Sequence, residues 1–286
     1  MSLTATTPRS HDFKGLSPHG FHRVVYHEWG DPRNSRVAIC VHGLGRNGRD
    51  FDVIAEALAA THRVLAVDMP GRGESDWLAD PNDYGFATYL TTLTALVARS
   101  GAESVDWIGT SMGGLLGIAI AAQPKQPIAR LVVNDVGPAI EPAALARIGE
   151  YIGMDPSFAS FDEAERYIRA VSAPFGALTE AEWTYLTRTN VRQRPDGRWR
   201  LAYDPGIAVP FRAQPAPPDL WGLWDAIRCP TLVLRGAASD LLSAATAAQM
   251  AARGPRPKVI EFAGVGHAPM LLTPDQIAPV VLFLNG

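Results

Sequence analysis

The residue with the clearest chemical potential is Ser111, which lies in the pentapeptide Gly109-Thr110-Ser111-Met112-Gly113. The pentapeptide directly follows an apolar run, residues 105–108, that predicts a β-strand. Glycines at 109 and 113 permit a sharp strand-to-helix turn, which can hold a serine hydroxyl exposed above a sheet. The pattern therefore predicts a nucleophilic serine.

A serine hydroxyl is a weak nucleophile, so it needs a base, and the base needs an acid that orients it. His267 follows the last predicted strand and is the candidate base. Asp240 follows the preceding strand and is the favoured acid, because it gives the chain order Ser, Asp, His expected after a G-x-S-x-G motif. Asp135 also follows a strand and remains a possible alternative acid.

Two backbone N–H groups are candidates for stabilising the oxyanion that forms when a serine attacks a carbonyl. Met112 follows the nucleophile at the predicted N-terminus of a helix, where the helix dipole favours negative charge. Leu44, in the loop His42-Gly43-Leu44-Gly45, could supply the second N–H. We interpret His42 and Gly43 as residues that shape this oxyanion loop.

Short apolar runs alternate with helical patterns along the chain, and this alternation must position those residues. Strands are predicted at residues 23–29, 37–41, 64–67, 105–108, 131–133, 231–234 and 259–262. Helices are predicted at residues 51–60, 88–98 and 112–122. Strands that are apolar on both faces predict an α/β fold with a mostly parallel central sheet covered by helices on both faces. Functional groups then gather at the carboxyl ends of the strands.

The alternation breaks after residue 137, where helical patterns replace the strands. We expect an inserted helical cap at residues 138–217, and a core domain made of residues 1–137 and 218–286. Within the insertion, helices are predicted at 141–151, 162–171 and 179–188, and an irregular stretch at 192–218. Aromatic side chains in and just beyond this region could line a pocket; the candidates are Tyr151, Trp183, Tyr185, Trp221 and Trp224. Arg212 could recognise a substrate carboxylate, and a solvated arginine is the favoured alternative.

The whole chain resembles the α/β-hydrolase fold superfamily, in particular its capped serine esterases and lactonases. The matching segments are His42-Gly43, Asp68-Met69-Pro70-Gly71-Arg72-Gly73-Glu74-Ser75, Gly109-Thr110-Ser111-Met112-Gly113, Asp240 and Gly266-His267. The resemblance implies a Ser/Asp/His triad, a helical cap after the sixth core strand, and neither a metal ion nor an organic cofactor. Some members place the acid where this chain has Asp135.

Composition restricts the partners. The net charge is −3 and no dense Lys/Arg run occurs, so a nucleic-acid partner is not expected. The longest apolar run, residues 112–122, is too short to span a bilayer, and the N-terminal residues lack the pattern of a signal peptide. We therefore expect a cytoplasmic protein without membrane contact. Cys40 and Cys229 are expected to be buried thiols, and the oligomeric state stays open.

These observations predict a hydrolase that cleaves a small or medium carboxylic ester through an acyl-enzyme on Ser111. Haloalkane dehalogenases and epoxide hydrolases of the same superfamily carry an aspartate at this position, so both activities are disfavoured. A lactonase, a carbon–carbon bond hydrolase, a cofactor-free perhydrolase and, less favoured, a lyase remain alternatives. A small-molecule receptor that keeps the fold and the triad is an alternative of another class.

Overall fold

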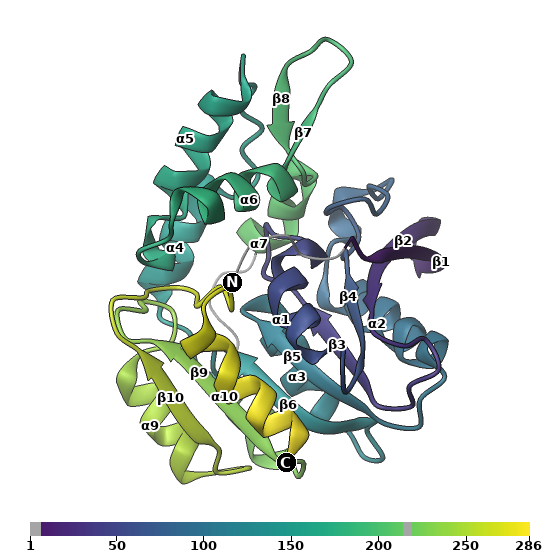
Figure 1. The fold of residues 1–286 in the computed structure, drawn as a ribbon, viewed down its shortest axis with the longest axis vertical. Coiled ribbons are helices and arrows are strands. Elements are labelled where there is room, and N and C mark those ends of the chain that lie inside the picture. Colours follow the sequence, from purple (N-terminus) through teal and green to yellow (C-terminus); the bar gives the residue numbers. More distant parts are fainter. Residues whose placement is uncertain (1–6, 214–218) are drawn as a thin grey trace.

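The computed structural model describes residues 7–213 and 219–286, and its centre is an eight-stranded sheet (Figure 1). The strand order is β1-β2-β4-β3-β5-β6-β9-β10. Strand β2 is antiparallel to both of its neighbours, β1 and β4, and all other neighbouring pairs in this sheet are parallel. The strands are β1 (Arg9–Ser17), β2 (Gly20–Trp29), β3 (Val37–Val41), β4 (Arg63–Val67), β5 (Val105–Thr110), β6 (Ile128–Asn134), β9 (Thr231–Gly236) and β10 (Lys258–Phe262).

Helices cover both faces of the sheet, because successive strand residues point to opposite sides. One face packs against α1 (Asp52–Leu58) and α10 (Pro274–Asn285). The other packs against α2 (Phe86–Ser100), α3 (Met112–Ala121), α8 (Trp221–Ala226) and α9 (Ala244–Ala252). Strand β3 illustrates the division: Ile39 belongs to the second layer, and Ala38 and Cys40 to the first. The predicted fold class is confirmed.

Strand β1 was not anticipated from the sequence. Its residues alternate between exposed and partly buried positions, and it pairs only with β2 at one edge of the sheet. Such a strand carries polar side chains such as His11, Asp12 and Lys14, so it lacks the apolar run that marked the inner strands.

Between β6 and β9 the chain leaves the sheet; we call the described part of this segment, residues 138–213, the insertion. It contains α4 (Pro142–Tyr151), α5 (Phe161–Val171), α6 (Glu180–Asn190), β7 (Val191–Gln193), β8 (Trp199–Leu201) and α7 (Ala208–Ala213). Helices α4, α5 and α6 correspond to the three predicted helices. Residues 192–213 are more ordered than predicted, because β7 and β8 form a hairpin and α7 follows. The predicted end of the insertion at residue 217 lies outside the described residues.

The insertion sits beyond one end of the sheet, and Figure 1 shows its helices gathered there. Hydrogen bonds join it to loops of the core: Tyr185 Oη donates to the carbonyl oxygen of Arg49 over 2.7 Å, and Asn47 Nδ2 donates to that of Thr189 over 2.8 Å. The backbone N–H of Gly266 donates to the carbonyl oxygen of Pro174 over 2.6 Å. These contacts hold the insertion against the loops that follow the strands.

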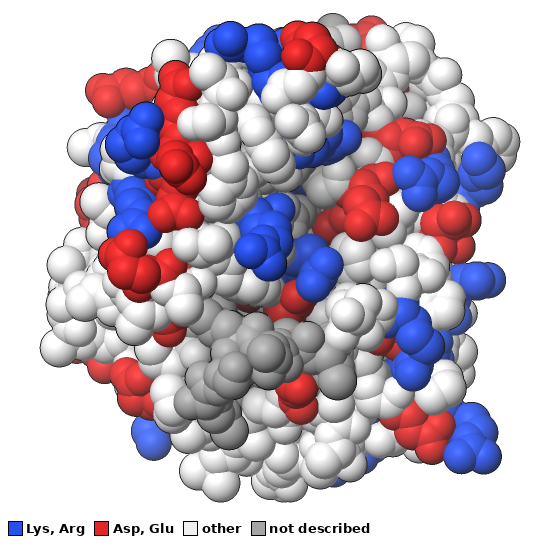
Figure 2. Space-filling model, turned by 45° about the horizontal axis from the view of Figure 1, so that its top comes forward, with Lys and Arg blue, Asp and Glu red and all other residues white. Residues whose placement is uncertain are grey.

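Both cysteines are buried and carry free thiols, and Cys40 lies within β3. Among the described residues, no helix combines the length and apolarity needed to cross a membrane. On the face that Figure 2 shows, acidic and basic side chains are intermixed rather than sorted into a belt of one sign.

Candidate active site

Ser111 occupies a strained turn between β5 and α3. Its φ of 53° and ψ of −116° lie in a region that side-chain-bearing residues rarely adopt. The glycines on either side are required by space: a Cβ at Gly109 would lie 2.2 Å from the carbonyl oxygen of Gly113, and a Cβ at Gly113 would lie 2.0 Å from that of Val41. The strand-turn-helix expected around Ser111 is therefore present.

His267 meets Ser111 across the site. Its Nε2 lies 3.0 Å from Ser111 Oγ, although 156 residues separate the two in sequence. The loop after β10 carries His267 and is joined to the loop after β9 by a 2.9 Å hydrogen bond from the N–H of Ala238 to the carbonyl oxygen of Val265. The predicted Ser111–His267 pair is thus within hydrogen-bond distance.

The carboxylate beside His267 belongs to Asp135. Its Oδ2 lies 2.9 Å from His267 Nδ1 and also accepts a 2.7 Å hydrogen bond from Ser239 Oγ. Its Oδ1 accepts a 2.8 Å hydrogen bond from the N–H of Gly236. Asp135 is fully buried and directly follows β6, so three polar groups fix this carboxylate in place.

The expectation that Asp240 would contact His267 is wrong. Its side chain is 46% exposed and forms an ion pair with Arg147, whose Nε and Nη2 lie 2.6 and 2.9 Å from the two carboxylate oxygens. This hydrogen-bonded pair lowers the pKa of the Asp240 carboxyl. In the same loop, Ser239 turns inward and binds Asp135, so Asp240 is directed outward. Asp135, the alternative candidate acid, occupies the position beside His267.

The predicted oxyanion loop is held by His42, which is fully buried. Its Nε2 accepts a 3.0 Å hydrogen bond from the N–H of Met69, and its Nδ1 lies 2.7 Å from the carbonyl oxygen of Gly43. An Nδ1–H tautomer satisfies both contacts. Burial lowers the pKa of His42 to about 4, so the imidazole is neutral near pH 7. This geometry supports the structural role predicted for His42.

The two candidate oxyanion donors, Leu44 and Met112, both lie near Ser111. Leu44 and Met112 both line a cavity that reaches Ser111. Within the described part of the chain, the backbone N–H groups of Leu44 and Met112 make no hydrogen bond. Both donors are therefore available to a ligand, as an oxyanion hole requires.

Arg72 is a fully buried cation that contacts both Leu44 and Met112. Its Nε donates to the carbonyl oxygen of Leu44 over 2.9 Å, and its Nη2 lies 4.0 Å from Met112 Sδ. Its Nη1 donates to Tyr89 Oη over 2.7 Å, and its guanidinium lies 5.0 Å from the centre of that ring. No carboxylate pairs with Arg72 among the residues the structure describes. The buried guanidinium, bound by uncharged groups, therefore places a positive charge beside the predicted oxyanion loop.

Two cavities meet at Ser111. The first, the His267 cavity, has a volume of about 120 Å³. Its residues include His267, Ser111, Arg46, Asp50, Arg147, Tyr151, Phe175 and Asn190. The second, the Met112 cavity, has a volume of about 410 Å³. Its residues include Met112, Ser111, Leu115, Ile140, Leu145, Phe211 and Arg212. Both cavities lie between the core and the insertion.

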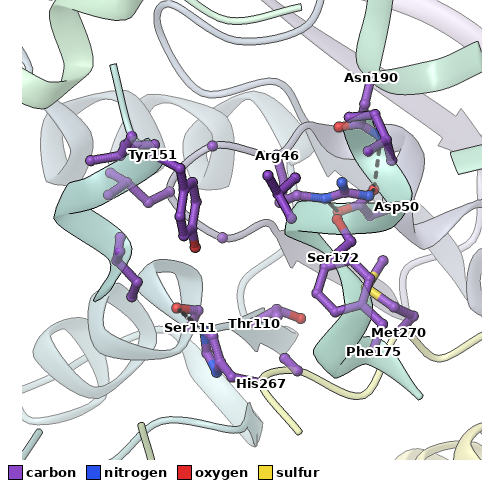
Figure 3. Close-up of a pocket in the computed structure, with 18 of the residues that line it drawn as sticks. Arg46, Asp50, Thr110, Ser111, Tyr151, Ser172, Phe175, Asn190, His267 and Met270 are labelled. Atoms are coloured by element: carbon purple, nitrogen blue, oxygen red, sulfur yellow. Dashed lines mark hydrogen bonds and ion pairs between the residues drawn. The ribbon is translucent and has the colours of Figure 1, made fainter. Parts of the chain in front are cut away.

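Figure 3 shows the His267 cavity from within. Tyr151 from α4 extends into it above Ser111, and Arg46 extends toward Asp50. Arg46, Asp50 and Asn190 were not singled out from the sequence, because polar and charged residues in loops and helices are usually solvated. Of the aromatic residues predicted from the sequence to line a pocket, Tyr151 lines this cavity, whereas Trp183 and Trp224 are buried in apolar clusters.

The fold and the site define a class of protein. A model of the alpha/beta hydrolase family matches residues 38–280, and the chain belongs to this family. It is 45% identical to a 3-hydroxybutyrate-oligomer hydrolase of Cupriavidus necator, over 99% of each chain. It is 30% identical to the esterase Rv0045c of Mycobacterium tuberculosis, over 72% of this chain and 67% of that one. An alpha/beta hydrolase from Novosphingobium aromaticivorans superposes with a TM-score of 0.88 at 38% identity, covering 97% of this chain and 99% of that one.

Proposed function

We propose that this hydrolase cleaves carboxylic esters, with Ser111 as nucleophile, His267 as base and Asp135 as the orienting acid. The observation that carries the proposal is the continuous chain of contacts from Ser111 Oγ to His267 Nε2, over 3.0 Å, and from His267 Nδ1 to Asp135 Oδ2, over 2.9 Å. A serine, a histidine and a buried carboxylate in this geometry are what acyl transfer needs.

In the proposed reaction, Ser111 Oγ attacks the ester carbonyl carbon while its proton passes to His267 Nε2. The N–H groups of Leu44 and Met112 donate to the oxyanion, and the charge of Arg72 favours its formation. The imidazolium then gives its proton to the departing alkoxide oxygen, and the acyl group stays on Ser111. His267 removes a proton from water, which attacks the acyl carbon and releases the acid, and Ser111 recovers its proton.

The insertion acts in this proposal as a cap, with residues 138–217 as its extent. It supplies Arg147, Tyr151 and Phe175 to the His267 cavity, and Phe211 to the Met112 cavity. Since the core supplies the reacting groups, the cap would set which ester enters.

The substrate class we propose is a short linear oligoester of a 3-hydroxyalkanoic acid. The relative that shares 45% identity over nearly the whole chain carries the name 3-hydroxybutyrate-oligomer hydrolase. The apolar Met112 cavity, lined by Leu115, Ile140 and Leu145, suits a short aliphatic acyl group.

The test is hydrolysis of the 3-hydroxybutyrate dimer and trimer, followed by chromatography of the released acid. We expect multiple turnovers of both by the wild-type enzyme and loss of several orders of magnitude in Ser111→Ala. Turnover of p-nitrophenyl butyrate without any cleavage of the oligomers would contradict the substrate class. Equal activity of Ser111→Ala would contradict the mechanism.

A further inference from the structure

The two cavities that meet at Ser111 differ in which catalytic group they contain. His267 lines the smaller cavity and is absent from the larger one, whereas Met112 lines only the larger. The base must hand its proton to the departing oxygen, so the leaving group has to extend toward His267. The acyl group then occupies the Met112 cavity, and the alcohol part of the ester occupies the His267 cavity.

The His267 cavity contains an arginine that is only partly used. Arg46 donates through Nε and Nη2 to the two oxygens of Asp50, over 2.7 and 2.6 Å. Its Nη1 donates no hydrogen bond to any described residue, and the side chain is 16% exposed. The guanidinium is also fixed from one side by the Phe175 ring, whose centre lies 5.4 Å away. Arg46 therefore presents a preorganised cationic edge within a largely enclosed space.

The surroundings of Arg46 favour a ligand with a single negative charge. Arg147, from α4, lines the same cavity and is held by Asp240 as Arg46 is held by Asp50. Each arginine is already paired with one carboxylate, so the cavity holds no large excess of positive charge for a dianion. A carboxylate can accept hydrogen bonds from a guanidinium N–H, and such charge-assisted bonds are strong in partly buried sites.

We propose that the His267 cavity binds the free carboxylate of the leaving group, with Arg46 as its direct partner and Arg147 as a second cation. This proposal rests on the proposed function. It defines the substrate as an ester whose alcohol part is itself a hydroxy acid, with its carboxylate unblocked. On a linear oligoester, the enzyme then removes one hydroxy acid per turnover from the carboxylate end.

The experiment compares the free 3-hydroxybutyrate dimer with its methyl ester, which has the same scissile bond but no charge on the leaving group. We expect wild-type kcat/KM for the internal ester bond to be about tenfold to a hundredfold higher with the free acid, mainly through KM. In Arg46→Gln this ratio should fall to near one. Arg99→Gln, which alters an exposed arginine at the end of α2, should keep the wild-type ratio.

A measurement on the wild-type enzyme avoids any effect of Arg46→Gln on folding. Free 3-hydroxybutyrate should inhibit hydrolysis of p-nitrophenyl butyrate competitively, and methyl 3-hydroxybutyrate should inhibit at least about tenfold more weakly. Equal hydrolysis of the dimer and its methyl ester, or equal inhibition by the two monomers, would overturn the carboxylate site while the proposed function stands. Cleavage of neither dimer, with p-nitrophenyl butyrate still turned over, would overturn the proposed substrate class together with the carboxylate site.

Discussion

At the scale of single residues, the choice of the acid decides how well the site can be known from sequence. Asp135 and Asp240 both follow strands, β6 and β9, that are neighbours in the sheet. Their distance from His267 depends on how each loop turns. Asp135, with a φ of 57°, turns inward immediately after β6, while Ser239 takes the inward position in the other loop. An aspartate with a positive φ carries no sequence signal that distinguishes it from any other aspartate in a loop.

We expect Asp135→Asn to lower kcat on p-nitrophenyl butyrate by about 10⁴-fold, because the amide no longer holds His267 in the tautomer that accepts the serine proton. Asp240→Asn is the matched control. It removes a half-exposed ion pair, so its kcat on this neutral ester should stay within about tenfold of wild type. Steady-state kinetics on both variants, with circular dichroism to show folding, checks this. The reverse order of effects would restore Asp240 as the acid.

At the scale of elements, β5, the turn and α3 could be predicted because their constraints are local. Apolar residues mark the strand, and glycines mark the turn. The hairpin of β7 and β8 was missed, because three-residue strands within a Pro- and Gly-rich stretch give no periodicity to detect. The cavity residue Arg46 was missed for another reason: its role depends on Phe175 and Arg147, which the fold brings from more than a hundred residues away.

A substitution in this strand-turn-helix tests how tightly it is packed. Gly113→Ala would place a methyl group 2.0 Å from the carbonyl oxygen of Val41, so α3 would have to shift away from β3. We expect the free energy of unfolding to fall by about 2 kcal/mol or more. Gly222→Ala, in α8, is the control because a Cβ there meets nothing within 4 Å. Urea denaturation that gives Gly113→Ala wild-type stability would refute this close packing.

At the scale of the whole molecule, the fold class was predictable because it depends on alternation over hundreds of residues. The position of the insertion against the core was less predictable, since it depends on side chains such as Tyr185 and Asn47 that bind distant backbone groups. The absence of a nucleic-acid partner and a cytoplasmic location stay predictions.

Global stability should depend on pH through His42. Its pKa of about 4 in the fold lies below the usual 6.5, so the unfolded chain binds a proton between these pH values that the folded chain excludes. The contribution of His42 to stability is therefore full well above pH 6.5 and is lost on acidification toward pH 4, and it amounts to about 3 kcal/mol. We expect the free energy of unfolding, measured by urea denaturation between pH 4.5 and 7, to change less steeply with pH in His42→Gln than in the wild type. The same dependence of the free energy of unfolding on pH in both proteins would rule out this contribution.

The central claim is that Ser111 is the nucleophile, and active-site labelling tests it most directly. The wild-type enzyme is treated with a fluorophosphonate, its remaining turnover of p-nitrophenyl butyrate is measured, and the labelled peptide is identified by mass spectrometry. We predict one adduct per chain, on Ser111, formed in step with the loss of turnover, and no such adduct in Ser111→Ala. An adduct on another residue, or full labelling of Ser111 with turnover retained, would contradict the account.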